Sequence, residues 1–303
     1  MDTLFSTYIL PAVLAFIMLG MGSTLTLENF RYLFRFPKGL LTGLLGQMVF
    51  LPLVAIAIAW VAPVSGVLKV GLVLVAACPG GATSNLIVHL LRGNVAMSVS
   101  FSAINSFLTM FSISFWVNLA LSLFAGGSAS IALSVQETFT HIFLIVLLPC
   151  VLGMVLKKWR PVFARKAERP MNIIMPVLLA IAMIGAIFID KKDGVQVDGN
   201  LLAIVFPWVF LLNITGLVGA FYIARSFRLG IRNSTTISIE VGMQNTGLAI
   251  YIATAPAMLH SAEAAIPAAV YALFTFFTAI GWGIFLRRKY VFGAFRKWRA
   301  TAK

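Results

Sequence analysis

The stretch Glu240-Val241-Gly242-Met243-Gln244-Asn245-Thr246-Gly247 decides how this chain folds. It is polar and contains glycine, yet it lies within an apolar run from about 231 to 255 that is long enough to cross a lipid bilayer. Backbone groups freed by a break in such a helix cannot face lipid, so they must be buried in protein or line a wet cavity. The stretch therefore predicts a broken membrane helix.

A second interruption, Cys78-Pro79-Gly80-Gly81, lies in the middle of the apolar run from 66 to 91. Proline removes a backbone donor, and the two glycines loosen the helical turn. The two broken segments are five segments apart, an odd step that reverses direction across the membrane. The segment before each break carries one mid-span amide, Gln47 or Asn213. Broken helices in matching halves predict an inverted repeat with a transporter's binding site between the halves.

The composition of the whole chain agrees with this interpretation. Hydrophobic residues make up 60% of the 303 residues, charged residues make up 11%, and the mean hydropathy is +0.99. Because a spanning helix needs roughly 20 apolar residues, we expect an all-α polytopic membrane protein. Nine apolar segments can be marked, at about 7–27, 38–61, 66–91, 94–124, 136–158, 169–190, 200–226, 231–255 and 265–288.

We expect these segments to form one integral membrane domain over residues 1–303 and to act as a monomer. The first repeat covers about 1–125, and the second covers about 136–290. The segment at 136–158 has no counterpart in the first half. The first repeat is therefore predicted to lack its first helix.

The net charge of +14 is distributed in a way that indicates topology rather than a nucleic-acid partner. Of the 23 lysine and arginine residues, all but Lys69, Lys191 and Lys192 lie at alternate junctions or in the carboxyl-terminal tail. Basic residues are retained on the cytoplasmic side of a membrane. The pattern predicts nine spans in a bacterial inner membrane, with the amino terminus outside and the carboxyl terminus inside.

Glu240 is the only one of the nine acidic residues that lies deep inside an apolar segment. An ionisable group there costs about 2.5–3.5 kcal/mol or more, so it indicates function unless it is paired. Residues Thr236, Glu240 and Gln244 are spaced four apart, as are Asn94, Ser98, Ser102 and Ser106, while Ser84 and Asn85 follow the first break. These oxygen ligands suit a hard cation such as Na⁺. Packing between helices stays open as an alternative role for the serines of 94–124.

Thr83 and Asn245 lie beside the two breaks, where the amino ends of helices present free N–H groups. Such ends attract anions through unpaired donors and the helix dipole. We therefore expect an anionic substrate. The predicted substrate-binding residues are Ala82, Thr83, Asn245 and Thr246.

Four stretches resemble the bile acid:sodium symporter family, and together the likeness covers nearly the whole chain. They are CPGGATSN at 78–85, RGNVAMSVS at 92–100, IEVGMQNTGLA at 239–249 and GMGSTLTLENF at 20–30. The resemblance implies two inverted repeats that form a panel domain and a core domain, with two broken helices that cross. It also implies a symporter of bile acids or other organic anions, driven by two Na⁺ ions and without an organic cofactor.

The resemblance implies two sodium sites. One consists of Ser84, Asn85, Ser98, Ser102 and Glu240, where relatives commonly have threonine at position 102. The other consists of Gln47, Glu240, Gln244 and the carbonyl groups of Val241 and Met243. Na⁺ is the only metal ion that the resemblance implies.

The chain also departs from its relatives. It looks like a nine-helix bacterial form, it has Ala82 before Thr83 where relatives often have the reverse order, and its last segment lacks the His-Asn pair common in bacterial bile-acid binders. A different substrate is the simplest inference, and pantoate-like acids, other small carboxylates, sulfonates and steroid conjugates all stay open.

Two alternatives remain beside the symporter. A proton-driven or arsenite-type carrier of related fold gains support from Cys78 beside the break, and protonation of Glu240 would also support it. An intramembrane enzyme would need clustered acids or a nucleophile near a base, and a single buried carboxylate does not supply these. We therefore expect a transporter and no enzyme.

Overall fold

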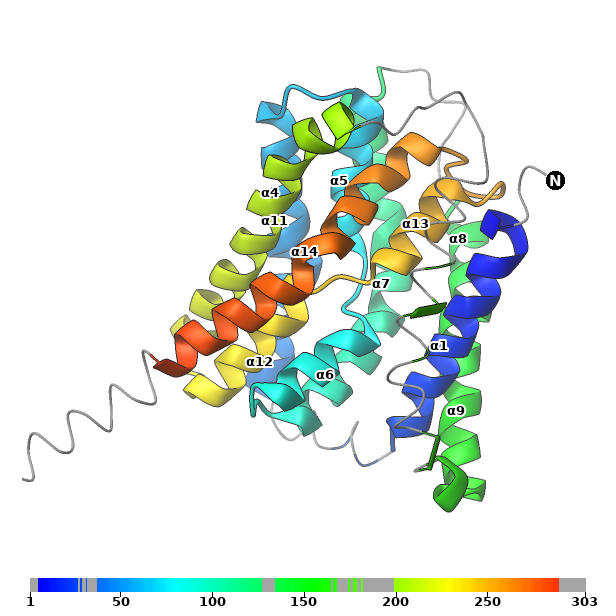
Figure 1. Cartoon of the computed structure of the whole chain (residues 1–303), viewed down its shortest axis with the longest axis vertical. Coiled ribbons are helices and arrows are strands. Elements are labelled where there is room, and N and C mark those ends of the chain that lie inside the picture. The colour runs from blue at the N-terminus through cyan, green and yellow to red at the C-terminus, as the bar shows by residue number, and fades with distance from the viewer. Residues whose placement is uncertain are drawn as a thin grey trace, which may run out of the picture.

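The computed structural model describes residues 5–26, 28, 31, 37–126, 134–164, 166, 167, 174, 177, 178, 181 and 199–288. These residues are almost entirely helical, as expected, and the strand-like pairing among them is one isolated bridge (Figure 1). The elements are η1 (Phe5–Ile9), α1 (Leu10–Thr24), α3 (Pro37–Leu44), η2 (Leu45–Phe50), α4 (Leu51–Val61), α5 (Gly66–Ala77), α6 (Ala82–Leu90), α7 (Val95–Phe124), α8 (Val135–Ile142), η3 (Phe143–Leu147), α9 (Leu148–Trp159), α11 (Gly199–Ser226), α12 (Ile231–Gly242), α13 (Thr246–Thr254) and α14 (Ala262–Arg287).

Six helices among the described residues are long and apolar enough to cross a membrane. They are Thr7–Thr24, Pro37–Val61, Val95–Phe124, Gln136–Trp159, Gly199–Ser226 and Ala262–Arg287. Each coincides with one of the nine predicted segments. The predicted segment at 169–190 lies largely outside the described residues.

The remaining two predicted segments are interrupted at the positions that the sequence indicates. Helix α5 ends at Ala77 and α6 begins at Ala82, with Cys78 already extended at φ −71° and ψ 149°. Helix α12 ends at Gly242 and α13 begins at Thr246, with Met243 extended at φ −117° and ψ 105°. Both predicted breaks are confirmed.

Polar side chains fix where several helices begin. Ser65, Asn94, Asn245 and Ser261 each accept a hydrogen bond from the backbone N–H three residues later, which starts α5, α7, α13 and α14. Such a bond satisfies one of the donors that a helix amino end leaves unpaired. The caps on α7 and α13 are the most relevant to the site. Helix α13 begins at the second break, and α7 carries Ser98 and Ser102.

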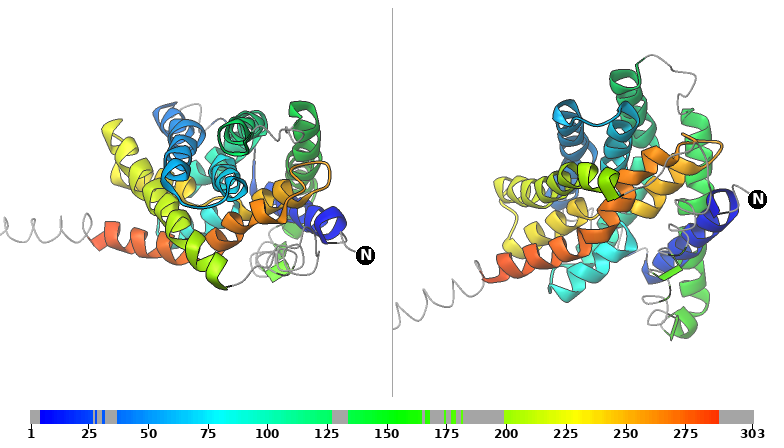
Figure 2. Two further views of the ribbon diagram at one scale, coloured as in Figure 1. Left: turned by 90° about the horizontal axis from the view of Figure 1, so that it is seen from above. Right: turned by 45° about the horizontal axis from the view of Figure 1, so that its top comes forward.

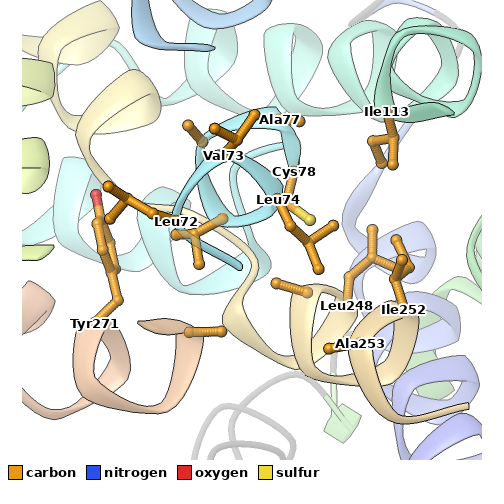
Figure 3. Packing of buried hydrophobic residues seen from close by; sticks show 14 of the residues in the cluster. Leu72, Val73, Leu74, Ala77, Cys78, Ile113, Leu248, Ile252, Ala253 and Tyr271 are labelled. Carbon is orange, nitrogen blue, oxygen red and sulfur yellow. The ribbon is translucent and has the colours of Figure 1, made fainter. Parts of the chain in front are cut away.

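The residues that pack these helices together are apolar near the breaks. Leu72, Val73 and Leu74 of α5 lie among Ile113 of α7, Leu248 and Ile252 of α13, and Tyr271 of α14 (Figure 3). Helices α5 and α7 pack antiparallel. The first residue of α5, Gly66, lies against the last residue of α7, and a Cβ on Gly66 would lie 2.1 Å from the carbonyl oxygen of Phe124. The two half-helices are thus held from several sides.

Helices α1 and α9 form a closely packed pair at one edge of the molecule, in every view (Figures 1 and 2). A Cβ on Gly22 would lie 1.9 Å from the carbonyl oxygen of Cys150, and one on Gly153 would lie 2.0 Å from that of Leu19. Small residues that allow two backbones to approach are typical of helix contacts in membranes. Helices α4 and α11 lie at the opposite edge (Figure 2).

The distribution of polar and apolar side chains is that of a membrane protein. Large apolar side chains such as Phe111, Phe115 and Phe277 are exposed on the outer surface. The buried side chains include Gln47, Ser98 and Glu240, which would lie on the surface of an ordinary soluble domain. Buried polar groups of this kind mark ion or substrate pathways when the surrounding solvent is lipid.

Candidate ion and anion site

The two breaks meet each other inside the molecule. The backbone N–H of Asn245 donates to the carbonyl oxygen of Pro79 at 2.8 Å, and Gly80 pairs with Gln244 in an antiparallel bridge. This close contact favours glycine at position 80, since a Cβ there would lie 3.0 Å from the carbonyl oxygen of Glu240 and 3.2 Å from its Oε2. The two interrupted helices therefore cross at their breaks, as the resemblance implies.

Glu240 lies beside this crossing and is completely buried. Its Oε2 accepts a hydrogen bond from the Ser102 hydroxyl at 2.6 Å. Its Oε1 accepts from the Ser84 hydroxyl at 3.0 Å and from the Ser98 hydroxyl. Three serines from two helices thus surround one carboxylate.

The hydroxyl groups of Ser84 and Ser98 have fewer protons to donate than there are acceptor oxygens within bonding distance of them. The Ser98 hydroxyl lies within bonding distance of Glu240 Oε1 and, at 2.6 Å, of Asn85 Oδ1. The Ser84 hydroxyl lies 3.0 Å from Glu240 Oε1 and 2.7 Å from the carbonyl oxygen of Gly81. A hydroxyl donates only one proton. With Glu240 ionised and Asn85 oriented with Oδ1 toward Ser98, two of these four contacts therefore bring oxygens together without a proton between them. Such an arrangement suits a small hard cation, which binds oxygen atoms without donors.

The first predicted sodium set is therefore brought together by the fold. Ser84 and Asn85 come from the first turns of α6, Ser98 and Ser102 come from α7, and Glu240 comes from α12. Sequence spacing suggested further members of this set. Among these, Asn94 caps α7, and Thr236 accepts from the Asn94 backbone N–H at 2.8 Å.

The second predicted sodium set is also gathered at the crossing, but its amides bond to each other. Gln47 Nε2 donates to Gln244 Oε1 at 3.0 Å, and Gln244 Nε2 donates to Gln47 Oε1 at 3.2 Å. Gln47 Nε2 also lies 2.7 Å from the carbonyl oxygen of Cys78, and Gln244 Nε2 lies 2.5 Å from that of Val241. Met243 follows α12 directly, and its carbonyl oxygen faces Gly80.

The prediction that Gln244 shares a helical face with Glu240 is wrong, because α12 ends at Gly242. Gln244 lies in the extended connection between α12 and α13, where it forms the bridge with Gly80. From this connection, the Gln244 side chain bonds to that of Gln47 in η2.

The predicted substrate residues lie at the amino ends of α6 and α13. The Asn245 side chain is buried and caps α13 through a 3.0 Å bond from the backbone N–H of Leu248. Thr246 is buried in the first turn of α13, and Thr83 is half-buried in the first turn of α6. Ala82 begins α6, but its side chain is not among those that the structure describes.

One polar cluster near the crossing was not assigned a role from the sequence. Asn213 Nδ2 and the Tyr271 hydroxyl donate to the carbonyl oxygen of Gly242, at 2.8 and 2.6 Å. Asn213 Nδ2 also lies 3.0 Å from the Tyr271 oxygen and 3.3 Å from Thr275 Oγ1. A rare mid-span amide was the signal for Asn213, but nothing in the pattern pointed to Tyr271.

Two crossing broken helices with a buried carboxylate and a shell of oxygen atoms define an ion-coupled membrane transporter. Comparison with known proteins gives the family. Residues 11–196 match the model of the Sodium Bile acid symporter family, and the chain belongs to this family. It is a sodium-dependent transporter built of membrane-spanning helices.

Several relatives support the assignment. The chain is similar to the "Uncharacterized sodium-dependent transporter YocS" of Bacillus subtilis (strain 168), with 31% identity over 89% of this chain and 80% of the relative. It is similar to the "Probable sodium/metabolite cotransporter BASS1, chloroplastic" of Oryza sativa subsp. japonica, with 31% identity over 80% of this chain and 57% of the relative. The "Hepatic sodium/bile acid cotransporter" of Rattus norvegicus is 25% identical over 79% of this chain and 65% of its own length.

Proposed function

We propose that this chain is a symporter that couples the movement of Na⁺ to the uptake of a small organic anion by alternating access. The observation that carries the proposal is the shortage of protons among the oxygen atoms around Glu240. A cation beside Oε1 would accept oxygen ligands from Ser84, Asn85 and Ser98 and would balance the buried negative charge. Breaking the charge balance of a buried carboxylate costs several kcal/mol, so a bound cation would be strongly favoured.

A second Na⁺ would bind at Gln47 and Gln244, together with Glu240 and the carbonyl groups of Val241 and Met243. The reciprocal amide pair must open for both side-chain oxygens to face an ion. This pair joins η2 to the connection between α12 and α13. Ion binding would therefore alter a contact at the crossing, and that contact can couple the ion to the conformation of the transporter.

The amino ends of the two half-helices support an anionic substrate. Among the described residues, helix α6 begins at Ala82 without a side-chain cap, and the amino end of a helix favours a bound anion. The crossing brings this end close to Asn245 and Thr246 of the other half. Ala82, Thr83, Asn245 and Thr246 form the proposed anion site. The rice relative is named for a metabolite and the rat relative for bile acid, which favours a carboxylate or bile-acid-like anion.

The environment of the breaks also supports the proposed inverted repeat. Gln47 donates to the carbonyl oxygen that follows α5, and Asn213 donates to the last carbonyl oxygen of α12. Each mid-span amide thus bonds to the end of the half-helix that follows it in sequence. We propose nine spans in one domain over 1–303, with repeats at about 1–125 and 136–290 and the amino terminus outside a bacterial inner membrane.

Alternating access would move the α1–α9 pair, as part of the panel domain, against the helices that carry the two breaks. The close contact between Gly22 and the Cys150 backbone favours movement of this pair as one body. We propose that a monomer carries out the cycle with two Na⁺ ions and no organic cofactor.

The environment of Cys78 favours sodium over an arsenite-type cargo. The Cys78 side chain is completely buried and lies beside Leu74 and Ala77 (Figure 3). A metalloid ligand would need a thiol that reaches the transport path. Uptake measured in sodium-free buffer across a range of pH separates the sodium symporter from a proton-driven carrier.

The decisive variant is Glu240→Gln, which keeps the shape of the side chain and removes its charge. Thermal denaturation of the purified protein is measured in NaCl and in choline chloride, and a panel of organic anions is added with and without sodium. We expect sodium to stabilise the wild type, by about 2.7 kcal/mol at 100 times the dissociation constant. Glu240→Gln should lose this stabilisation and all sodium-dependent uptake.

The matched control is Glu137→Gln, which changes an exposed glutamate near the start of α8. It should respond to sodium like the wild type. Sodium stabilisation that persists in Glu240→Gln would reject the proposal.

A further inference from the structure

Asn105 of α7 is a buried amide that the proposed mechanism does not yet use. Its side chain has no exposed surface, and neither Oδ1 nor Nδ2 has a hydrogen-bond partner among the described residues. Leaving a buried polar group unpaired costs about 1–3 kcal/mol, and this residue leaves two. An asparagine at such a position is expected to meet a ligand during the working cycle.

The position of Asn105 on α7 links it to both predicted sodium sets. It follows Ser102 by three residues, so it lies on the same side of the helix as the serine that donates to Glu240 Oε2. Further along α7, Trp116 Nε1 donates to the carbonyl oxygen of Met48, the residue next to Gln47. Toward the other end, a Cβ on Gly43 would lie 2.5 Å from the ring of Phe101. Asn105 therefore lies between two positions of α7, Phe101 and Trp116, that contact the segment containing Gln47.

The two oxygens of Glu240 are not equally surrounded. Oε1 accepts from Ser84 and Ser98, whereas Ser102 is the only donor to Oε2 among the described residues. A carboxylate oxygen can accept two bonds, so Oε2 keeps capacity for a further partner. That partner can be a cation on the side of α7 where Asn105 lies.

The chemistry of an unpaired amide limits which ligands can satisfy Asn105. Oδ1 needs a proton or a positive charge, and Nδ2 needs an acceptor. A partly hydrated sodium ion offers both, since the ion binds Oδ1 and one of its waters accepts from Nδ2. An isolated water would also satisfy both atoms, but its binding would not depend on sodium.

We propose that Asn105 is a further sodium-binding residue, whose side-chain carbonyl oxygen coordinates the ion on the Oε2 side of Glu240. This assignment rests on the proposed sodium symport. It places one residue within reach of the carboxylate that both predicted sodium sets share. Loss of Asn105 should weaken sodium binding without weakening the fold.

The test is the variant Asn105→Ala, with thermal denaturation of the purified protein in mixtures of NaCl and choline chloride at constant ionic strength. In choline chloride the variant should be as stable as the wild type, because alanine favours the helix and removes two unpaired groups. The sodium concentration for half-maximal stabilisation should rise about tenfold or more. The isosteric variant Asn105→Asp retains an oxygen ligand and should keep a response to sodium that Asn105→Ala loses.

The matched control is Ser114→Ala. Ser114 is also completely buried in α7, and its hydroxyl also has no partner among the described residues, but it lies three helical turns from Ser102. It should leave the sodium response unchanged. If Asn105→Ala responds to sodium like the wild type, Asn105 binds water only and the inference is wrong while sodium symport stands. If the wild type itself shows no response to sodium, both proposals fail.

Discussion

Gly80 shows how a single residue affects the geometry of the proposed ion site. It is the point where the first break approaches the second, with Glu240 Oε2 3.2 Å and the carbonyl oxygen of Met243 3.4 Å from the position of a Cβ. Any side chain here would press on the backbone of the other broken helix and on the carboxylate at the same time. The lack of a side chain at Gly80 therefore allows the first break to lie close to Glu240.

We expect Gly80→Ala to lower stability by about 1–3 kcal/mol, since two of the three nearest atoms are backbone oxygens that cannot move aside easily. It should also weaken sodium stabilisation, because the added methyl group lies beside Oε2. Thermal denaturation in NaCl and in choline chloride measures both effects. Gly281→Ala is the control, since a Cβ there has no atom within 4 Å among the described residues. Equal stability and equal sodium stabilisation of the two variants would show that the crossing can accommodate a methyl group at position 80.

At the scale of a secondary-structure element, α13 shows how a break can be stable inside a membrane. The helix begins at Thr246 with Asn245 as its cap, and the backbone N–H of Asn245 is satisfied by Pro79 of the other break. The first break thus provides a partner for a backbone donor of the second. Such pairing keeps a freed backbone group from facing lipid.

We expect Asn245→Ala to destabilise the protein by about 1 kcal/mol, because the side-chain acceptor for the Leu248 N–H is lost. Asn245→Ser keeps a capping oxygen and should retain most of the stability. The comparison is made by thermal denaturation in choline chloride, where sodium binding does not contribute. A serine variant as unstable as the alanine variant would indicate that the amide acts through contacts other than the cap.

At the scale of the whole molecule, the prediction that remains open is orientation in the membrane. The two cysteines of the chain are buried, so surface cysteines can be introduced against a low background. Ala257 lies in an exposed connection between α13 and α14, and Ser226 is exposed at the end of α11. The distribution of basic residues predicts that these two positions lie on opposite sides of the membrane.

A membrane-impermeant maleimide should label Ala257→Cys in intact cells. The same reagent should label Ser226→Cys only after the cells are permeabilised. Labelling in the reverse pattern would invert the predicted orientation. Labelling of both positions in intact cells would contradict the assignment of a spanning helix between them.

The sequence by itself determined the class of the protein, its two breaks and its buried carboxylate. Apolar segments of spanning length form helices in lipid, because a helix satisfies its own backbone groups. A polar tract such as 240–247 within one of them costs too much free energy to lack a role. The prediction of oxygen ligands for a first sodium set followed from this logic together with the family resemblance. These features depend on local chemistry, so a single chain displays them without its partners.

Only the tertiary structure decided which polar groups meet. Helical spacing suggested Thr236 and Gln244 beside Glu240, but the helix ends at Gly242 and the Thr236 hydroxyl accepts from the Asn94 backbone. The pairing of Gln47 with Gln244, the proton shortage at Ser98 and the unpaired amide of Asn105 all depend on contacts between distant segments. Periodicity describes one helix at a time, whereas hydrogen-bond partners are set by how helices cross.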